Sequence, residues 1–321
     1  MATYLVTGGA GFIGSNFVRY VFEQEPAATV LNLDSLTYAG VPATVAELDQ
    51  LGDHRFTKGD IRDPQQVDDL VARADVVVNF AAESHVDRSI TGPSDFITTN
   101  VVGTGVLLDA AHRHGVERFV HVSTDEVYGS IQEGFANEDA ALRPSSPYSA
   151  SKAGSDLLVG SYATTFGYQT IVTRCTNNYG PYQFPEKLIP LFTTNLLDGR
   201  RVPLYGDGMN ERDWLYVEDH CSAIFTLIET GVPGEIYNIG ANNQIPNVEI
   251  AQRLLVLMGK DDSYIEYVDD RPGHDRRYAV DSTKVRALGW EPSKTFVERL
   301  DDTIEWYRSR RDWWEPLKGP A

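Results

Sequence analysis

A tyrosine and a lysine lie four residues apart in the segment Tyr148-Ser-Ala-Ser-Lys152. On a helix this spacing brings both side chains to one face, about one turn apart. A tyrosine hydroxyl ordinarily titrates at about pH 10, and a neighbouring ammonium together with a positively charged ring bound beside it would lower its pKa by stabilising the phenolate. The pair therefore indicates a base that accepts the proton of an alcohol. A tyrosine and a lysine that merely pack together on a helix surface would show the same spacing.

Two adjacent acids, Asp125 and Glu126, follow Thr124 at the end of a β-rich run over 118–123. Carboxyl groups next to a tyrosine base are suited to further proton transfers. Alone, the Thr-Asp-Glu run would favour a solvated loop or a helix cap. We predict a catalytic role because the run comes shortly before the Tyr148/Lys152 pair in the same predicted fold.

A glycine motif lies between a β-rich run over 3–7 and a helical pattern over 12–25. Gly8, Gly11 and Gly14 would allow a tight turn, close approach of the backbone to a pyrophosphate, and close packing of the helix on the strand. The unpaired N–H groups at the start of that helix would face the phosphates. The motif predicts dinucleotide binding, with a plain glycine-rich turn as the alternative.

Asp34 follows the second β-rich run, 29–33, at the distance from the glycine motif that a ribose-binding acid requires. Its carboxylate would accept hydrogen bonds from both hydroxyls of the adenosine ribose and would repel a 2′-phosphate. We therefore predict NAD rather than NADP as the cofactor. The alternative for Asp34 is the N-cap of a helix.

β-rich runs alternate with helical patterns through the first part of the chain, and this order predicts an α/β fold with a doubly wound parallel Rossmann sheet. We expect an NAD-binding domain over 1–178 and a smaller C-terminal substrate-binding lobe over 179–321, with segments near 213–240 returning to the sheet. The expected strands are 3–7, 29–33, 55–58, 75–80, 118–123, 169–174 and 235–239. The expected helices are 12–25, 64–73, 94–115, 147–167, 248–258 and 295–311.

Ligands of such sheets bind outside the carboxyl ends of the strands. Residues after the third, fourth and fifth strands are therefore candidates to complete the cofactor site. The cofactor candidates are Gly8, Gly11, Phe12, Ile13, Gly14, Asp34, Asp60, Ile61, Phe80, Ala81, Ala82, Ser84, Thr99, Ser123, Tyr148 and Lys152.

The composition excludes several classes of protein. The chain has 321 residues with 28 Lys and Arg against 46 Asp and Glu, a formal net charge of −18. Such an acidic chain is poorly suited to nucleic acid or an anionic membrane surface. We find neither a membrane-length apolar run nor a secretory signal, and expect a cytoplasmic protein. Cys175 and Cys221 are too few for a disulfide framework or a four-ligand zinc site, so we expect no metal. Cys175 is expected to act as a small buried hydrophobic residue.

Taken together, the glycine loop, Ser123-Thr124 and the Tyr148/Lys152 pair resemble the extended short-chain dehydrogenase/reductase superfamily. Within it, the runs at 123–129 and 177–182 are similar to segments of the nucleotide-sugar 4,6-dehydratases, most closely the dTDP-glucose 4,6-dehydratases. Further matching segments lie at 81–89, 185–190, 205–208 and 270–274. The resemblance covers essentially the whole chain and shows no departure at the catalytic positions.

The resemblance implies an NAD-dependent lyase that converts dTDP-glucose to dTDP-4-keto-6-deoxy-glucose. Tyr148 would take the C4 hydroxyl proton while hydride passes to NAD⁺, with Thr124 bonded to the C4 oxygen. Glu126 would then remove the C5 proton, and Asp125 would protonate the departing C6 hydroxyl. For this chemistry Asp125 must be protonated and Glu126 ionised, so their environments must differ.

The resemblance also implies the substrate contacts. Local cations must offset the net negative charge where a nucleotide diphosphate binds, and Lys187, Arg212 and Arg271 are the candidates. Pro203 and Tyr205 would sandwich the base. Asn178 would lie on the cofactor side. The substrate candidates are Ser84, Thr124, Asn177, Lys187, Leu188, Pro203, Tyr205, Arg212, Asn247, Arg271 and His274. The alternatives are lobe core for Pro203, Leu188 and Tyr205, and a surface ion-pair cluster for 211–213.

A homodimer is also implied, with helices 94–115 and 147–167 packed against their symmetry mates as a four-helix interface. Apolar residues on these helices exceed what one sheet face needs. They are Val101, Val102, Leu107, Leu108, Leu157 and Leu158. The alternative is that all six pack against the sheet.

Two other functions remain as alternatives. A 4-epimerase or decarboxylase acting on a UDP-sugar would share the cofactor site, but reversible oxidation at C4 needs no second acid, so Asp125 favours a dehydratase. A non-catalytic dinucleotide sensor would need neither the acids nor the Tyr148/Lys152 pair. The nucleobase and the downstream pathway stay open.

Overall fold

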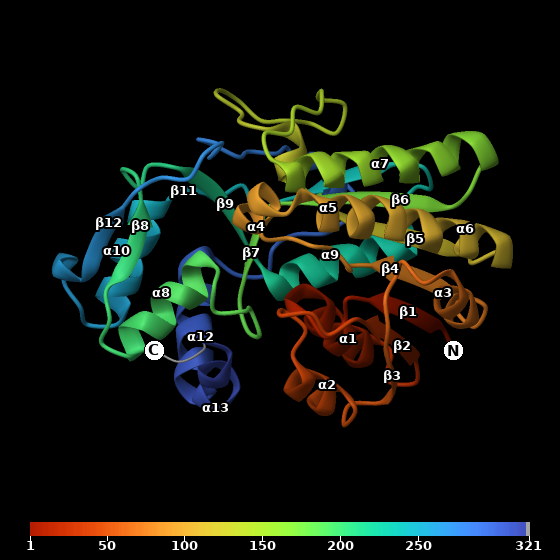
Figure 1. Ribbon diagram of the computed structural model, residues 1–321, viewed down its shortest axis with the longest axis horizontal. Helices are drawn as coiled ribbons and strands as arrows, with labels where there is room; N and C mark the ends of the chain where they lie inside the picture. The colour runs from red at the N-terminus through yellow and green to blue at the C-terminus, as the bar shows by residue number, and fades with distance from the viewer. Residues whose placement is uncertain (319–321) are drawn as a thin grey trace.

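The computed structural model describes residues 1–318, which form a large sheet with helices on both faces and a smaller lobe at one end (Figure 1). All seven strands of the sheet are parallel, in the order β10-β6-β5-β4-β1-β2-β3. The doubly wound parallel fold is therefore confirmed. The strands are β1 (Thr3–Thr7), β2 (Thr29–Asp34), β3 (Asp53–Lys58), β4 (Val76–Asn79), β5 (Arg118–Thr124), β6 (Thr170–Cys175) and β10 (Ile236–Ile239).

Helices cover both faces of this sheet, as its two-sided apolar strands require. The helices α1 (Phe12–Gln24), α2 (Pro42–Leu48) and α9 (Val217–Thr230) pack on one face. The helices α3 (Pro64–Val71), α6 (Thr104–His114) and α7 (Pro147–Phe166) pack on the other. Figure 1 shows α7 and α1 on opposite sides of the sheet.

The prediction of one uninterrupted α-helix over 94–115 is wrong. The chain instead forms α5 (Pro93–Phe96), a π-helical stretch η1 (Ile97–Gly103) and then α6. Buried Asn100 lies in the π-helical stretch, where its amide donates to the Glu83 carbonyl at 3.0 Å and to Ser151 Oγ at 2.8 Å. The wider turn thus ties the loop after β4 to α7, and π-helical turns of this kind are frequent next to functional sites.

The smaller lobe contains a three-stranded sheet, β11-β9-β7, and a two-stranded sheet, β12-β8. Their strands are β7 (Asn177–Tyr179), β8 (Val202–Tyr205), β9 (Glu211–Tyr216), β11 (Gln244–Pro246) and β12 (Ile265–Val268). Its helices are α8 (Leu188–Leu197), α10 (Asn247–Leu257) and α12 (Phe296–Ser309). In the sequence, α9 and β10 come between the lobe strands β9 and β11, but in the fold they belong to the large sheet and its covering helices. The shorter helices are α4 (Val86–Thr91), η2 (Asp125–Tyr128), η3 (Asp262–Tyr264), α11 (Thr283–Arg286), α13 (Arg311–Trp314) and η4 (Glu315–Lys318).

The C-terminal helices reach back to the N-terminal half. Trp313 and Trp314 are buried in a cluster with Val41 and Tyr307. The Trp313 indole donates to Thr44 Oγ1 of α2 at 2.9 Å. The end of the described chain therefore covers α2, immediately after the loop that follows β2.

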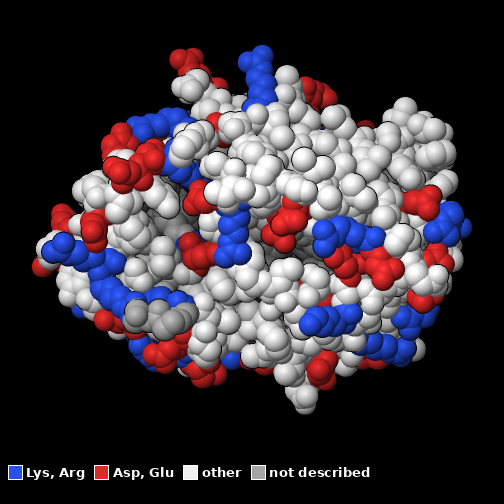
Figure 2. Space-filling view, in the orientation of Figure 1, with Lys and Arg blue, Asp and Glu red and all other residues white. Residues whose placement is uncertain are grey.

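Acidic and basic side chains alternate over the face drawn in Figure 2. Any anionic ligand must therefore be met by individual cationic side chains placed at its site. Across residues 1–318, no helix has both the length and the apolar character needed to cross a membrane. The same residues contain no cluster of three or more His, Cys, Asp or Glu side chains that could hold a metal ion.

Candidate functional site

A cavity of about 430 Å³ lies at the carboxyl ends of the large sheet and extends to the lobe. It brings together all sixteen residues that were singled out from sequence as cofactor candidates, and Asn178 with them. Thr124, Asp125 and Glu126 line the same cavity. Segments from Gly8 to Asn178 thus meet in one place, as the topology of a parallel sheet predicts.

The glycine loop, which we call the glycine cradle, leaves its backbone uncovered by side chains toward the cavity. Gly8 has a φ of +73°, and a Cβ there would lie 2.8 Å from the Ala81 backbone nitrogen. A Cβ on Gly14 would lie 2.3 Å from the Gly8 carbonyl oxygen. No side chain caps the start of α1, whose first residues line the cavity. These residues fit a dinucleotide pyrophosphate, because the backbone can approach closely and free N–H groups face it.

Asp34 ends β2 with its carboxylate held in a fixed orientation. Its Oδ2 accepts from the Ala10 N–H at 3.0 Å, and its Oδ1 accepts from the Leu36 N–H at 2.8 Å. Burial raises the pKa of Asp34, and these two hydrogen bonds oppose the rise. Asp34 is not a helix N-cap, because Val41 takes that position for α2.

Helix α7 presents Tyr148 and Lys152 to the cavity. A capping box starts the helix: Ser146 Oγ accepts from the Ser149 N–H at 3.1 Å, and Ser149 Oγ accepts from the Ser146 N–H at 3.0 Å. Tyr148 is buried in the first turn, and Lys152 Nζ donates to the Val122 carbonyl at 2.8 Å. The two side chains therefore reach the end of β5 from one helix face, as their spacing predicts.

The lowering of the Tyr148 pKa was expected with a positive nicotinamide bound beside it, and it stays a prediction for that state. Burial and the negative charge of Glu126 raise the pKa of Tyr148 well above its usual value of about 10. Burial lowers the pKa of Lys152 to about 8, with its ammonium directed at a backbone carbonyl. Burial is the largest of the effects on the Tyr148 pKa, and the sequence argument did not include it.

Thr124 and the two acids form the junction of β5 with the short helix η2. Thr124 Oγ1 accepts from the Glu126 N–H at 3.2 Å and lies 3.3 Å from Asp125 Oδ1, to which it donates. Asp125 is buried, and its Oδ2 has no hydrogen-bond partner within residues 1–318. Glu126 keeps part of its surface exposed.

The two acids differ in their electrostatic surroundings. Burial and the Glu126 charge raise the pKa of Asp125 well above its usual range. Burial also raises the pKa of Glu126, but the cationic side chains of Arg212, Arg271 and Lys187 oppose that rise. A proton held by the pair is therefore biased toward Asp125, which is the direction that an acid and a base side by side require.

Comparisons with known proteins agree with this geometry. A family model described as GDP-mannose 4,6 dehydratase matches residues 5–303. The dTDP-glucose 4,6-dehydratase of Streptomyces antibioticus is 55% identical over 327 residues, covering 99% of this chain and 97% of that protein. The chain belongs to the dTDP-glucose 4,6-dehydratase family. The crystal structure of the Streptomyces venezuelae dTDP-glucose 4,6-dehydratase DesIV with NAD bound is 53% identical, with a TM-score of 0.95 over 98% of this chain and 99% of that chain. UDP-glucose 4-epimerase from Thermotoga maritima is 30% identical, with a TM-score of 0.90 over 96% of this chain and 99% of that chain.

The residues expected from the dehydratase resemblance to contact substrate fall into two groups. One group lines the cavity: Ser84, Thr124, Asn177, Lys187 and Leu188. The other lies outside its lining, on the lobe: Pro203, Tyr205, Arg212, Asn247, Arg271 and His274. The cationic members of this second group still influence the cavity, since Arg212 and Arg271 oppose the pKa rise of Glu126.

Burial decides some of the alternatives for these residues. Tyr205 is 43% exposed and lies edge-on to His274, with ring centroids 6.2 Å apart, so it is not lobe core. Arg212 and Asp213 are buried, which excludes a surface ion-pair cluster. The Arg212 guanidinium donates to the Asp275 carbonyl at 2.9 Å and lies 4.1 Å from the centre of the Tyr278 ring. Arg271 is paired with Asp87 at 3.0 Å.

Buried Cys175 lines the cavity as an unreactive thiol. Its Sγ donates to the Ser123 carbonyl at 3.3 Å, and burial raises its pKa to about 12. The expectation of a small buried hydrophobic residue is confirmed.

Sequence reasoning missed a cluster at the mouth of the cavity. Tyr38 donates its hydroxyl to Glu186 Oε1 at 3.0 Å, and the Arg88 guanidinium lies 3.4 Å from the centre of the Tyr38 ring. Tyr38 and Glu186 both line the cavity. The available signal was position: Tyr38 comes four residues after Asp34, and Glu186 directly precedes Lys187.

Proposed function

We propose that this protein is an NAD-dependent dTDP-glucose 4,6-dehydratase, a hydro-lyase that forms dTDP-4-keto-6-deoxy-glucose. The observation that carries the proposal is the meeting of Tyr148 with an adjacent acid pair in the cavity that holds the glycine cradle. An alcohol oxidation needs only the tyrosine. The two acids, one biased toward its protonated form, are suited to an elimination that follows the oxidation.

The cofactor would lie with its pyrophosphate on the glycine loop and its adenosine ribose on Asp34. When bound there, NAD⁺ would accept hydride from C4 of the sugar and later supply it to C6. Ser123, Asn178 and Lys152 would line its nicotinamide end, where a positive ring also opposes the burial that raises the Tyr148 pKa.

The chain's own residues would carry the proton transfers. Tyr148 accepts the C4 hydroxyl proton, and Thr124 donates a hydrogen bond to the C4 oxygen. The resulting ketone acidifies the neighbouring C5–H bond. Glu126 removes that proton, and Asp125 protonates the C6 hydroxyl, so that the C6–O bond breaks, water leaves and a C5–C6 double bond forms. Once hydride has returned to C6, Glu126 gives its proton back to C5.

For substrate contacts we propose the two groups of residues described above. Lys187 would meet the sugar end of the diphosphate, while Arg212 and Arg271 can hold phosphate oxygens in a planar fork. Tyr205 would stack on the base, since an exposed aromatic ring at the lobe surface is free to do so.

We propose a homodimer formed through the continuous helical segment η1–α6 and helix α7. Leu157 of α7 is 67% exposed and Val102 of η1 is 53% exposed. Val101 of η1 and Leu158 of α7 are half-buried, and both line one surface hollow with Val102. Leu107 and Leu108 are buried against the sheet, so the expectation that they exceed its needs is wrong. We also propose a cytoplasmic location, which suits two cysteines that are both free.

The deciding experiment offers dTDP-, UDP-, GDP- and CDP-glucose to the purified protein and identifies the product by NMR. The expected result is a 4-keto-6-deoxy sugar, formed fastest from dTDP-glucose. A product that keeps its C6 hydroxyl and differs from the substrate only by inversion at C4 would instead make the protein an epimerase, the activity named for the Thermotoga maritima neighbour. No turnover together with tight NAD binding would favour a dinucleotide sensor.

A further inference from the structure

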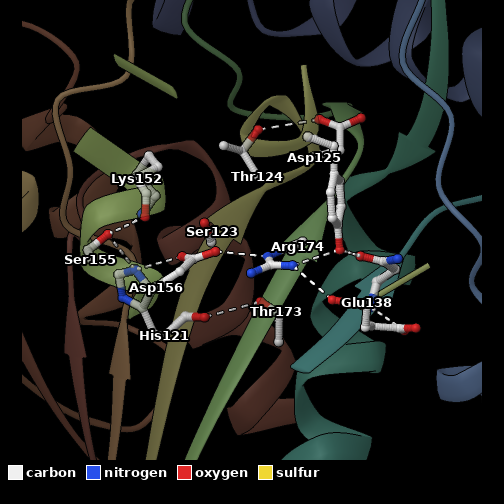
Figure 3. Close-up of polar contacts among 12 residues, drawn as sticks. His121, Ser123, Thr124, Asp125, Glu138, Lys152, Ser155, Asp156, Thr173 and Arg174 are labelled. Atoms are coloured by element: carbon white, nitrogen blue, oxygen red, sulfur yellow. Dashed lines mark hydrogen bonds and ion pairs between the residues drawn. The ribbon is translucent and has the colours of Figure 1, made fainter. Parts of the chain in front are cut away.

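A buried ion pair lies directly behind the catalytic residues (Figure 3). Arg174 Nε of β6 donates to Asp156 Oδ2 of α7 at 2.8 Å, and their side chains are only 3% and 1% exposed. Removing two charges from water costs about as much as their attraction returns, so such a pair is weak evidence for stability. The residues that Asp156 and Arg174 contact therefore point to a role other than stability.

One end of the pair belongs to the oxidation machinery. Asp156 lies one helical turn beyond Lys152 on α7. Between them, Ser155 Oγ donates to the Lys152 carbonyl at 2.8 Å and lies 3.0 Å from His121 Nε2 of β5. The negative charge of Asp156 also opposes the burial that lowers the pKa of Lys152.

The other end belongs to the elimination machinery. Arg174 Nη1 donates to the Tyr128 hydroxyl at 2.8 Å, and that hydroxyl donates to Asn238 Oδ1 at 2.8 Å. Tyr128 is the last residue of η2, the four-residue helix that begins with Asp125 and Glu126. A single 3₁₀ turn has no stability of its own, so its orientation depends on what its residues contact.

We propose that Asp156 and Arg174 are a positioning pair that fixes the Asp125–Glu126 turn relative to the Tyr148–Lys152 face of α7. This inference rests on the proposed function, in which oxidation at C4 and elimination across C5 and C6 occur on one bound sugar. The tyrosine must reach C4 and the acids must reach C5 and C6 without the sugar moving. A rigid link from α7 through Asp156, Arg174 and Tyr128 meets that requirement.

The test removes the hydrogen bond between Arg174 and the Tyr128 hydroxyl and leaves the Asp156–Arg174 ion pair in place. Tyr128→Phe deletes only the hydroxyl that accepts from Arg174. Tyr237→Phe is the matched control, because Tyr237 is also buried and its hydroxyl also accepts one hydrogen bond, from the Val232 N–H at 2.9 Å. Tyr237 precedes Asn238 on β10, but successive strand residues point to opposite faces, so its side chain is not part of the Tyr128 contacts. Arg174→Lys is a second variant that keeps a charge beside Asp156 without the planar fork that reaches Tyr128.

Single-turnover experiments with dTDP-glucose follow bound NADH by stopped-flow absorbance and product by NMR. In Tyr128→Phe we expect oxidation within about twofold of the unmodified protein. We expect elimination to slow about 10- to 100-fold, the size of effect that misplacing reacting groups by up to about 1 Å produces. NADH therefore accumulates. Amide hydrogen exchange over residues 124–129 should rise in Tyr128→Phe and stay unchanged in Tyr237→Phe.

Arg174→Lys should show the same accumulation of NADH, and adding it to Tyr128→Phe should cause no further loss, because both variants break one link. The proposal is overturned if the effects add, if Tyr128→Phe behaves like Tyr237→Phe, or if oxidation and elimination slow together. Failure of the proposed function would look different, since the unmodified protein would then form neither NADH nor the 4-keto-6-deoxy product.

Discussion

Asp125→Asn separates the two chemical stages of the proposed reaction. The substitution keeps the size and shape of the side chain, and Thr124 keeps a partner at Oδ1. Burial and the Glu126 charge raise the pKa of Asp125 and so favour its neutral carboxyl form, which an uncharged amide resembles. The one property lost is a carboxylic proton at Oδ2, the atom that has no hydrogen-bond partner in residues 1–318.

The size of the effect follows from that loss. A positioned acid contributes about 10²- to 10⁴-fold, or roughly 3–5 kcal/mol at about 1.36 kcal/mol per tenfold change in rate. Turnover should fall by that factor, while reduction of bound NAD⁺ by dTDP-glucose should proceed. In the unmodified protein, elimination should slow as the pH rises through the Asp125 pKa, since the carboxyl then loses the proton it must donate. That alkaline decline should vanish in Asp125→Asn.

The assay is stopped-flow absorbance of bound NADH in single turnover, beside NMR of the C5 position in deuterated solvent. Asp125→Asn should hold NADH for far longer than the unmodified protein, and Glu126→Gln should also slow the C5 exchange. Tyr148→Phe should give neither signal, because oxidation itself fails. If Asp125→Asn abolishes the NADH signal as completely as Tyr148→Phe, the division of labour is wrong. Full activity in Asp125→Asn would remove the reason for preferring a dehydratase to an epimerase.

Three further predictions concern the cofactor, the assembly and the C-terminal helices. Asp34→Ala should weaken NAD binding and relieve the exclusion of NADP, measured by titration of both; equal binding of both by the unmodified protein would contradict the ribose assignment. Leu157→Glu should convert a dimer to a monomer by light scattering at micromolar concentration, whereas the control Val256→Glu, on the exposed face of α10, should not; a monomeric unmodified protein would exclude the dimer. Trp314→Ala should lower the free energy of unfolding by about 3–5 kcal/mol in urea denaturation, since Trp314 is fully buried and donates to the Tyr307 carbonyl; a loss under about 1 kcal/mol would show that its cluster contributes little.

The strands of the large sheet were predictable because their apolar runs are short and nearly continuous, as burial on both faces demands. Helix α8 was missed because Pro190 reads as a helix breaker. It lies at the third helical position, where the missing N–H has no intrahelical partner to lose. The π-helical stretch was missed because its residues keep a helical pattern, and only the contacts of Asn100 distinguish it.

At the site, the residue types and their spacing were enough to place the catalytic and cofactor candidates in one cavity. Sequence could not reveal how deeply each is buried, and burial raises the pKa of Tyr148, an effect that the sequence argument left out. Contacts between distant segments were also hidden. Nothing near Asp156 in the chain indicates that its partner is Arg174 or that Tyr128 lies beyond it.

The contact of Trp313 with Thr44 has a consequence for the order in which the protein matures. The two residues are 269 positions apart. At about 5–20 residues per second, a growing chain makes Trp313 on the order of tens of seconds after Thr44. During that interval α2 and the loop that joins it to β2 are not covered by the C-terminal helices. While the chain is still being synthesised, the apolar surface around Val41 is therefore exposed to solvent. Molecular chaperones can bind this surface until the last helices have been made and cover it.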